Sequence, residues 1–326
     1  MAERGARKPH TRLNLSRATT IPLSTRSSKV TKDLLADPER YDVAVSGIER
    51  LMPSILAGQD IKSLADAWAS AVRQGRSVVL GMGAHVIKVG LSRLIIDLLG
   101  RGYLHAVAAT GAVAIHDLEM ALTGQTSEDV ADGLQRGTFG MAEETGRVYW
   151  DAVALAARED YGLGQALGRL IAESGARHHD LSVFAAAYER DVPATLHVAV
   201  GTDIAHMHPS HDGSALGLAA FRDFQVFSEV VKGMDDGGVY VNLGSAVVLP
   251  EVFLKALNIA RNIDGRPHRI VTADLDMVRH YRPAQNVVDR PTVPDGKGYR
   301  ITGHHEILFP LLYAMVRARI ENHRSA

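Results

Sequence analysis

Short apolar runs alternate with segments of helical periodicity, and this alternation restricts the possible folds more than any other feature of the chain. The runs are continuous in apolar residues, which is typical of parallel strands buried on both faces. They lie at Ser77–Gly81, Leu104–Ala109, Thr195–Val200, Gly238–Leu243 and His268–Ala273. Strands alternating with helices predict an α/β fold with a Rossmann-like parallel sheet that carries helices on both faces.

The helical segments lie between and around these runs, at Ser63–Arg73, Val86–Leu99, Val113–Leu122, Phe221–Lys232, Leu249–Asn262 and Glu306–Arg319. The sequence Thr-Ser-Glu-Asp at Thr126–Asp129 matches a capping box and predicts the start of another helix. We predict a single domain over residues 41–326. Residues 1–40 are expected to form an N-terminal arm that is partly disordered, because its start is rich in serine, threonine and arginine and has no apolar run.

Composition excludes several classes of function. The chain of 326 residues has a formal net charge of −1, which provides no general attraction to nucleic acid or to a membrane. It has no apolar stretch of the ~20 residues that span a bilayer and no secretory signal. The absence of cysteine excludes disulfides, iron–sulfur clusters and a thiol nucleophile, and it leaves 15 histidines as the bases for neutral pH. We expect a soluble, cytoplasmic protein whose partner is a small molecule.

Small residues mark the ends of three predicted strands. The corners are Gly81–His85, Ala109–Ala112 and Leu243–Ala246. Ligands of open parallel sheets bind at the carboxyl ends of the strands, and small residues there allow the backbone to approach a phosphate closely. None of the corners matches the G-x-G-x-x-G fingerprint, so spacing alone leaves nucleotide binding open.

Five segments of the chain occur in the order and spacing of deoxyhypusine synthase, and the chain resembles most closely the bacterial deoxyhypusine synthase-like branch of that family. The segments are Gly81–Gly90, Ala109–Asp117, Asp212–Ser214, Leu243–Val248 and Phe309–Leu312, and the resemblance extends from about Ser77 to the C-terminal helix. It implies a deoxyhypusine synthase-like NAD-binding fold, with NAD at the strand ends and a homotetramer with sites at subunit interfaces.

The resemblance also implies which positions contact NAD. The turn Thr110, Gly111 and Ala112 corresponds to a cofactor-binding turn of the family, and Thr272 and Ala273 correspond to a pair near the nicotinamide. His85 replaces an asparagine of the family, and His116 replaces a glutamate. The full implied set is Gly83, His85, Thr110, Gly111, Ala112, His116, Asp212, Gly244, Ser245, Ala246, Thr272 and Ala273.

The chain departs from the family at the position of its chemistry. The family forms a covalent imine on a lysine in a Trp-Gly-Lys segment, whereas the matching stretch here, Arg282–Pro291, has neither lysine nor tryptophan. Arginine stays protonated and forms no imine. An acidic position that binds the polyamine substrate is Gly217 here. We therefore expect neither deoxyhypusine synthesis nor a polyamine substrate.

Histidines are the candidates to replace the missing lysine. His206, His208 and His211 lie close together in the sequence, where they could converge on a metal or form an ordinary surface loop. Alternatively, His208 or His211 acts as a general base beside Asp212. His304 falls on an aspartate of the family. Lys88 lies among apolar residues, where it either extends to solvent or acts as a nucleophile with a lowered pKa.

These observations favour an NAD-dependent transferase or oxidoreductase that acts on an amine- or hydroxyl-bearing substrate, with His208, His211, His304 or Lys88 as catalytic residues. One alternative is a nucleotide-binding protein without catalysis. The other is a metal-dependent enzyme that uses His206, His208 and His211.

Overall fold

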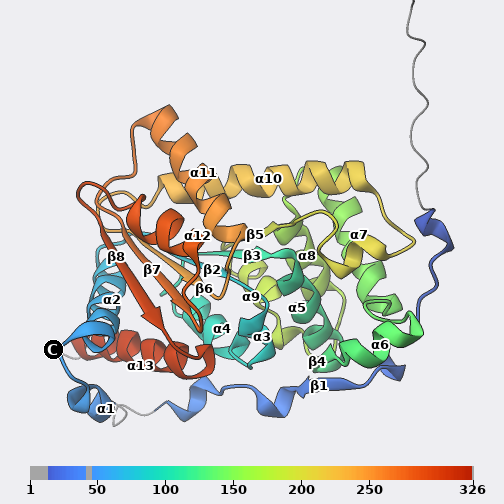
Figure 1. Ribbon diagram of the computed structural model, residues 1–326, viewed down its shortest axis with the longest axis horizontal. Coiled ribbons are helices and arrows are strands. Elements are labelled where there is room, and N and C mark those ends of the chain that lie inside the picture. Colours follow the sequence, from blue (N-terminus) through green and yellow to red (C-terminus); the bar gives the residue numbers. More distant parts are fainter. Residues whose placement is uncertain (1–13, 42–45, 325–326) are drawn as a thin grey trace, which may run out of the picture.

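The computed structural model describes residues 14–41 and 46–324, and its centre is a sheet of six parallel strands (Figure 1). The strands are β2 (Val78–Met82), β3 (Ala106–Thr110), β5 (Ala194–His197), β6 (Val239–Leu243), β7 (Val271–Asp276) and β8 (Lys297–Thr302). Each neighbouring pair is parallel. The prediction of an α/β fold with a parallel sheet is therefore confirmed.

The strand order is β5-β3-β2-β6-β7-β8. The chain moves outward from β2 through β3 to β5, returns to the other side of β2 as β6, and moves outward again to β8. This is the strand order of the doubly wound dinucleotide-binding fold. The direction in which successive strands are added to the sheet reverses between β2 and β6. The carboxyl ends of β2 and β6 therefore form the switch point, where ligands of such sheets bind.

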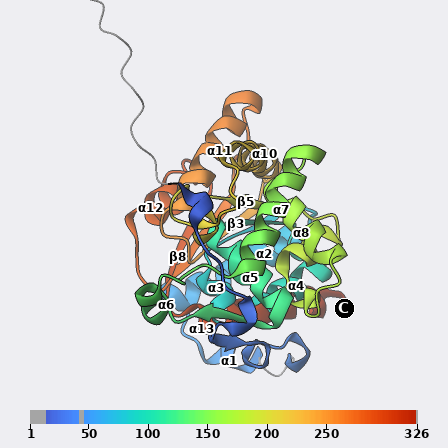
Figure 2. The ribbon, with the colours of Figure 1, turned by 90° about the vertical axis from the view of Figure 1, so that its right-hand side faces the viewer.

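Helices cover both faces of the sheet, as predicted. Figures 1 and 2 agree that α10 (Gly213–Lys232) and α11 (Val248–Asp264) lie above it and α13 (His305–Arg324) below it. Side chains of β2 alternate between the two resulting cores, with Val78 in the lower core and Val79 in the upper one. The remaining longer helices are α2 (Leu56–Arg73), α4 (Ser92–Gly100), α5 (Gly111–Thr123), α7 (Glu143–Glu159) and α8 (Leu163–Glu173).

Shorter helices connect these elements. They are α1 (Ser46–Leu51), α3 (His85–Lys88), α6 (Val130–Arg136), α9 (Val183–Tyr188) and α12 (Tyr281–Pro283). The helix predicted over Val86–Leu99 is divided into α3 and α4, so its continuity was wrong. Gly90 lies between them with a φ of +81°, and a Cβ there would approach the Leu34 carbonyl oxygen to 2.9 Å. The close approach of this earlier segment thus requires glycine and ends the first helix.

The segment from residue 14 to 41 lies along the surface of the domain. Its strand β1 (Ser28–Thr31) pairs antiparallel with β4 (Gln125–Glu128). The capping box predicted at Thr126–Asp129 is therefore wrong: Thr126 belongs to β4, and Asp129 alone caps α6, by accepting a bond from the Asp132 amide. The predicted disorder of the arm concerns in part residues 1–13, which lie outside the described residues.

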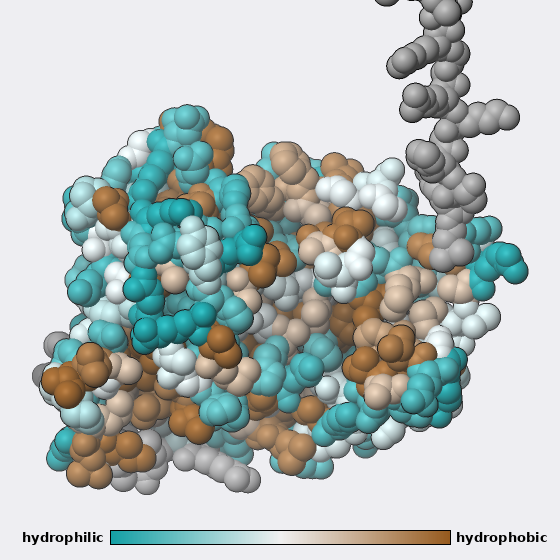
Figure 3. Space-filling view, in the orientation of Figure 1, coloured by the Kyte–Doolittle hydropathy of each residue, from teal (hydrophilic) through white to brown (hydrophobic). Residues whose placement is uncertain are grey.

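Apolar side chains are exposed at one corner of the molecule. Figure 3 shows them at the lower left, over α1 and the start of α2, where Leu51, Ile55 and Leu56 are exposed. Patches of this kind are typical of surfaces that contact another protein. Within the described part of the chain, no helix combines the length and the apolar character needed to cross a membrane.

Candidate functional site

Two glycines bring the backbone segments after β2 and β6 together at the switch point. The Gly83 amide donates to the Leu243 carbonyl oxygen at 2.9 Å. A Cβ on Gly83 would overlap the Gly244 carbonyl oxygen, and one on Gly244 would lie 2.6 Å from Cε1 of His305. Gly244 also has a φ of +69°. Both positions therefore require glycine, and the corner presents backbone rather than side chains.

His305 is the side chain that packs against this corner. It is 1% exposed, and its ring centroid lies 5.3 Å from that of His85. Its Nε2 is 3.5 Å from Oδ1 of Asp276, at the end of β7. Neither ring nitrogen has a hydrogen-bond partner among the described residues. A buried imidazole without partners beside a carboxylate is a candidate for proton transfer.

Two aspartates of β7 support this cluster. Burial raises the pKa of Asp274 to about 6, although the Asn242 side chain donates to it at 2.7 Å. Burial also acts to raise the pKa of Asp276, but the nearby His305 ring and a bond from the Met277 amide outweigh it and lower the pKa below its ordinary value. Asp276 is thus the charged member of the pair and can orient the His305 ring.

His85 and Lys88, on α3, extend the cluster toward β3. Burial, with smaller contributions from His305 and Lys88, lowers the pKa of His85, so the ring is neutral at pH 7. Lys88 also contributes to lowering the pKa of His116, on α5. Lys88 follows His85 by three residues on α3 and lines one cavity with His116, so it lies between the two halves of the site.

A cavity of about 230 Å³ lies on the β3 side of the switch point. It contains three predicted site residues, Lys88, Ala112 and His116, whose side chains share its wall with apolar and charged groups. The other lining residues are Arg26, Ile115, Glu119, Ser127, Glu128, Val130, Phe139, Thr202, Asp203 and Ile204. Burial lowers the pKa of His116 to about 4, against the opposing charge of Glu119. The cavity is large enough for one small ring system.

The turn after β3 is occupied by a carboxylate. Thr110 precedes α5 as its N-cap without a side-chain capping bond, and a Cβ on Gly111 would overlap the carboxylate of Asp203. Burial raises the pKa of Asp203 above its ordinary value. Because a carboxylate already lies against the start of α5, a phosphate group is not favoured at this helix end.

The other residues implied to bind the cofactor lie in structural positions. Oδ1 of Asp212 accepts bonds from the Ser214 and Ala215 amides at 3.0 Å, which caps α10. Oγ1 of Thr272 is buried and donates to the Val287 carbonyl oxygen, and Ala273 lies in the core. Oγ of Ser245 accepts a bond from the Leu249 amide, whereas Ala246 is half-buried in the turn before α11.

The run His206, His208 and His211 does not form a metal site. His206 accepts a bond from the Gly201 amide through Nδ1, His208 is buried against Gly146, and the His211 ring meets the His208 carbonyl oxygen. No three His, Cys, Asp or Glu side chains in the described ranges are arranged to hold a metal ion. The structure therefore does not favour the metal-dependent alternative.

The predicted His304 and its neighbour His305 face different surroundings. The His304 side chain is 64% exposed, and its Nδ1 lies 3.7 Å from Glu306. Sequence reasoning did not select His305, Asp276, Asp274 or Asn242. A polar residue inside the apolar runs of β6 and β7 was the signal that could have identified the last three.

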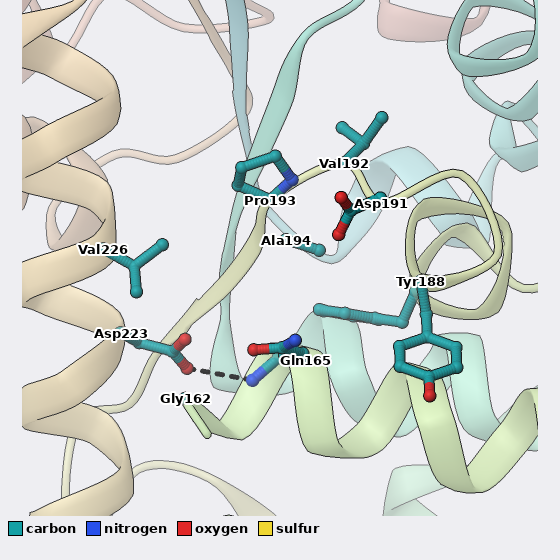
Figure 4. Close-up of a pocket in the computed structure, with 11 residues that line it drawn as sticks. Gly162, Gln165, Tyr188, Asp191, Val192, Pro193, Ala194, Asp223 and Val226 are labelled. Atoms are coloured by element: carbon teal, nitrogen blue, oxygen red, sulfur yellow. Dashed lines mark hydrogen bonds between the residues drawn. The ribbon is translucent and has the colours of Figure 1, made fainter. Parts of the chain in front are cut away.

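A second cavity, of about 250 Å³, lies at the opposite end of edge strand β5 (Figure 4). Asp223 of α10 forms part of its wall and accepts bonds from the Gly164 and Leu196 amides at 2.9 and 3.0 Å. Burial raises the pKa of Asp223 to about 7, despite these bonds. The carboxyl group thereby joins the start of α8 to the free edge of the sheet, which is a structural role.

Comparisons with known proteins identify the fold but no family. No family model matches the sequence, and no curated protein matches it. A conserved putative LOR/SDH protein from Methanococcus maripaludis S2 superposes with a TM-score of 0.52 at 14% identity, over 98% of this chain and 75% of that one. The cyanobacterial arginine dihydrolase ArgZ gives 0.50 at 18%, over 83% of this chain.

Unliganded AgrE gives a TM-score of 0.51 at 13% identity, over 89% of this chain. The chain spans about a third of the length of the ArgZ and AgrE chains, 31% and 34%. A putative deoxyhypusine synthase from Entamoeba histolytica gives 0.49 at 9%, over 80% of this chain and 88% of that one. The chain thus shares its fold with proteins that include enzymes.

Proposed function

We propose that this protein is an NAD-dependent enzyme of the deoxyhypusine synthase type that oxidises an amine- or hydroxyl-bearing small molecule, with or without subsequent group transfer, and that it does not synthesise deoxyhypusine. The observation that carries the proposal is the switch point between β2 and β6. There a corner of two obligatory glycines adjoins the buried Asp276–His305–His85 cluster on one side and the charged cavity on the other.

The residues around the switch point fit a dinucleotide. The glycines at 83 and 244 allow the two backbone segments and the His305 ring to pack closely at the corner, and the cavity beside it combines apolar walls with an exposed cation, Lys88. The carboxylate of Asp203 disfavours a phosphate at the start of α5, so Lys88 is the group that would pair with a phosphate. When bound, NAD supplies the acceptor for a hydride.

The chain's own residues supply the proton chemistry. Oxidation of a carbon that bears an amine or a hydroxyl requires removal of a proton from nitrogen or oxygen. Asp276 orients the His305 ring through Nε2, which leaves Nδ1 as the atom that takes this proton. His85 is neutral and lies next to His305, so it can pass the proton onward. No lysine is needed for these steps.

The shared fold supports catalysis over a purely structural role, because solved proteins of this fold include enzymes. A non-catalytic nucleotide-binding protein would keep the glycine corner but would gain nothing from a buried imidazole without partners. Buried polar atoms of that kind cost stability, and a role in proton transfer gives the His305 nitrogens a reason to be retained.

The first experiment measures NAD binding by isothermal titration calorimetry. Ala112→Phe fills the cavity and is expected to abolish binding, whereas Ala176→Phe changes a half-buried alanine outside it and is expected to bind like the natural protein. No binding to the natural protein, or equal binding by both variants, would contradict the proposal.

The second experiment follows NADH formation with panels of amines and alcohols. His305→Gln is expected to lower kcat about 100-fold or more, as the loss of a general base does, while NAD binding stays unchanged. The neighbouring His304→Gln is the matched control and is expected to keep full activity. NAD binding without any reduction across both panels would favour the non-catalytic alternative.

We also propose that the protein is a homotetramer, as the resemblance implies. Exposed apolar side chains support self-association, among them Phe221 of α10, which is 60% exposed, and the patch at Leu51, Ile55 and Leu56. Light scattering coupled to size-exclusion chromatography tests this, and a monomer at micromolar concentration would refute it.

A further inference from the structure

A chain of hydrogen bonds runs through the wall of the charged cavity and ends at His116. Arg26 donates to both carboxylate oxygens of Glu119, at 2.8 and 2.7 Å. Oγ1 of Thr126 donates to Oε2 of Glu119 at 2.6 Å, and Nδ1 of His116 lies 2.7 Å from the same threonine oxygen. Glu119 and Thr126 are buried.

The order of donors in this chain determines the tautomer of His116. A carboxylate paired with a guanidinium accepts hydrogen bonds and donates none. The single hydroxyl proton of Thr126 therefore goes to Glu119, and the threonine oxygen can only accept from the ring. Nδ1 of His116 must carry its proton, and in the neutral ring Nε2 is then an acceptor.

The Nε2 edge of His116 is the edge available to a ligand. The ring lines the cavity, while its Nδ1 edge is turned to Thr126, which does not line it. Burial keeps the ring uncharged at pH 7 by lowering its pKa to about 4, although Glu119 opposes this and Lys88 and Arg26 assist. The cavity thus presents an acceptor that cannot donate.

We propose that this cavity is the subsite for an adenine ring and that His116 recognises the exocyclic amino group of that ring through Nε2. The inference rests on the proposed function, because the adenine belongs to the proposed NAD. The cavity lies on the β3 side of the switch point, whereas the Asp276–His305 cluster lies toward β7. The two halves of a dinucleotide divide across the switch point in this fold.

The rest of the cavity suits a purine. Ile115, Val130, Phe139 and Ile204 provide apolar surface for the ring faces, and the Lys88 ammonium can donate to a ring nitrogen or to a phosphate oxygen. Hypoxanthine carries a carbonyl oxygen in place of the amino group. Two acceptors would then face each other, so the cavity should discriminate against it.

The test compares adenine ligands with their hypoxanthine counterparts. Calorimetry measures the binding of NAD and nicotinamide hypoxanthine dinucleotide, and of AMP and IMP, to the natural protein, to Thr126→Val and to Thr126→Ser. The natural protein is expected to prefer adenine by about tenfold or more. Thr126→Val removes the acceptor of Nδ1, so its preference should fall below about threefold; Thr126→Ser keeps the relay and the preference.

The outcomes separate this inference from the proposed function. If the natural protein binds both dinucleotides equally, the adenine subsite is wrong and NAD dependence stands. If NAD does not bind but AMP is preferred over IMP in a Thr126-dependent manner, the subsite stands and the proposed function fails. If no adenine ligand binds, both are wrong.

A second measurement does not depend on the folding of a variant. The ¹⁵N chemical shifts of the His116 ring distinguish a protonated from an unprotonated nitrogen. A protonated Nδ1 with an unprotonated Nε2 supports the relay, and a protonated Nε2 would overturn it.

Discussion

Replacing Arg26 with methionine would leave a buried carboxylate without its counter-charge. Arg26 lies in the segment before β1 and Glu119 lies in α5, and their side chains are only 7% and 1% exposed. The guanidinium donates to both carboxylate oxygens. Methionine keeps much of the apolar stem of arginine, so the substitution removes the charge and its bonds with little change in packing.

The cost of this substitution follows from the burial of Glu119. Removing one partner of a buried ion pair costs about 3–5 kcal/mol, because the other charge stays in a medium of low dielectric constant. The hydroxyl groups of Thr126 and Thr145, at 2.6 and 3.4 Å, remain to stabilise the carboxylate. We therefore expect Arg26→Met to lower the free energy of unfolding by about 3 kcal/mol, near the lower end of that range.

A double-mutant cycle in urea isolates the pair. Glu119→Gln alone should also be destabilising, since it leaves the guanidinium only Glu128 as a partner, at 3.5 Å. The double variant removes both charges of the Arg26–Glu119 pair, so the two single effects should be coupled by about 2 kcal/mol. The exposed pair Arg169–Glu173 is the matched control, and Arg169→Met should cost below about 0.5 kcal/mol. If Arg26→Met costs no more than this control and the cycle shows no coupling, the segment before β1 does not place Arg26 against Glu119 of α5.

Three further predictions use the same urea assay. The first concerns Asp223, whose pKa burial raises from 3.8 to about 7, so that between these values the folded protein holds a proton that the unfolded chain releases. Asp223→Asn cannot titrate, so the natural protein should lose stability relative to this variant as pH rises from 4 to 7. The opposite slope would mean that the two amide bonds outweigh burial. The second compares two glycines. Gly244→Ala should cost at least about 1 kcal/mol because of its φ of +69° and the nearby His305 ring, whereas Gly217→Ala, with open space around it in α10, should stabilise the protein by about 0.5–1 kcal/mol. Equal effects would mean that position 244 does not require glycine. Tyr240→Phe removes a buried hydroxyl that has no partner among the described residues, so it should be neutral or stabilising, and a cost above about 1 kcal/mol would reveal a hidden partner.

The sequence predicted the elements whose pattern is local. The five apolar runs correspond to strands of the parallel sheet, because burial on both faces leaves a continuous apolar signature. Strand β8 was missed, since this edge strand, Lys297–Thr302, mixes charged and apolar residues. Most of β4 was read as part of a capping box for a different reason: its pairing with β1 joins residues far apart in the chain, and no local pattern records such a pairing.

The candidate site divides in the same way. The small residues at the strand ends, Gly83 and Gly244 among them, indicated the edge at which we propose that a ligand binds, and the structure places both glycines at a corner that only glycine fits. Which histidine lies beside Asp276 in the candidate site could not be predicted from the sequence. His304 and His305 are adjacent in the sequence, but His305 is the first residue of α13 and His304 precedes the helix, so the two side chains meet different surroundings.

Which of the two histidines meets Asp276 therefore depends on how α13 packs below the sheet. The same is true of Arg26, which lies 93 residues from Glu119 in the chain and bonds to it only in the folded domain. The amino-acid sequence by itself determined the parallel sheet and the glycine corners at the carboxyl ends of its strands, since burial and glycine leave local signatures. Only the tertiary structure decided which charged and titratable groups share that edge, because such contacts join distant segments through packing.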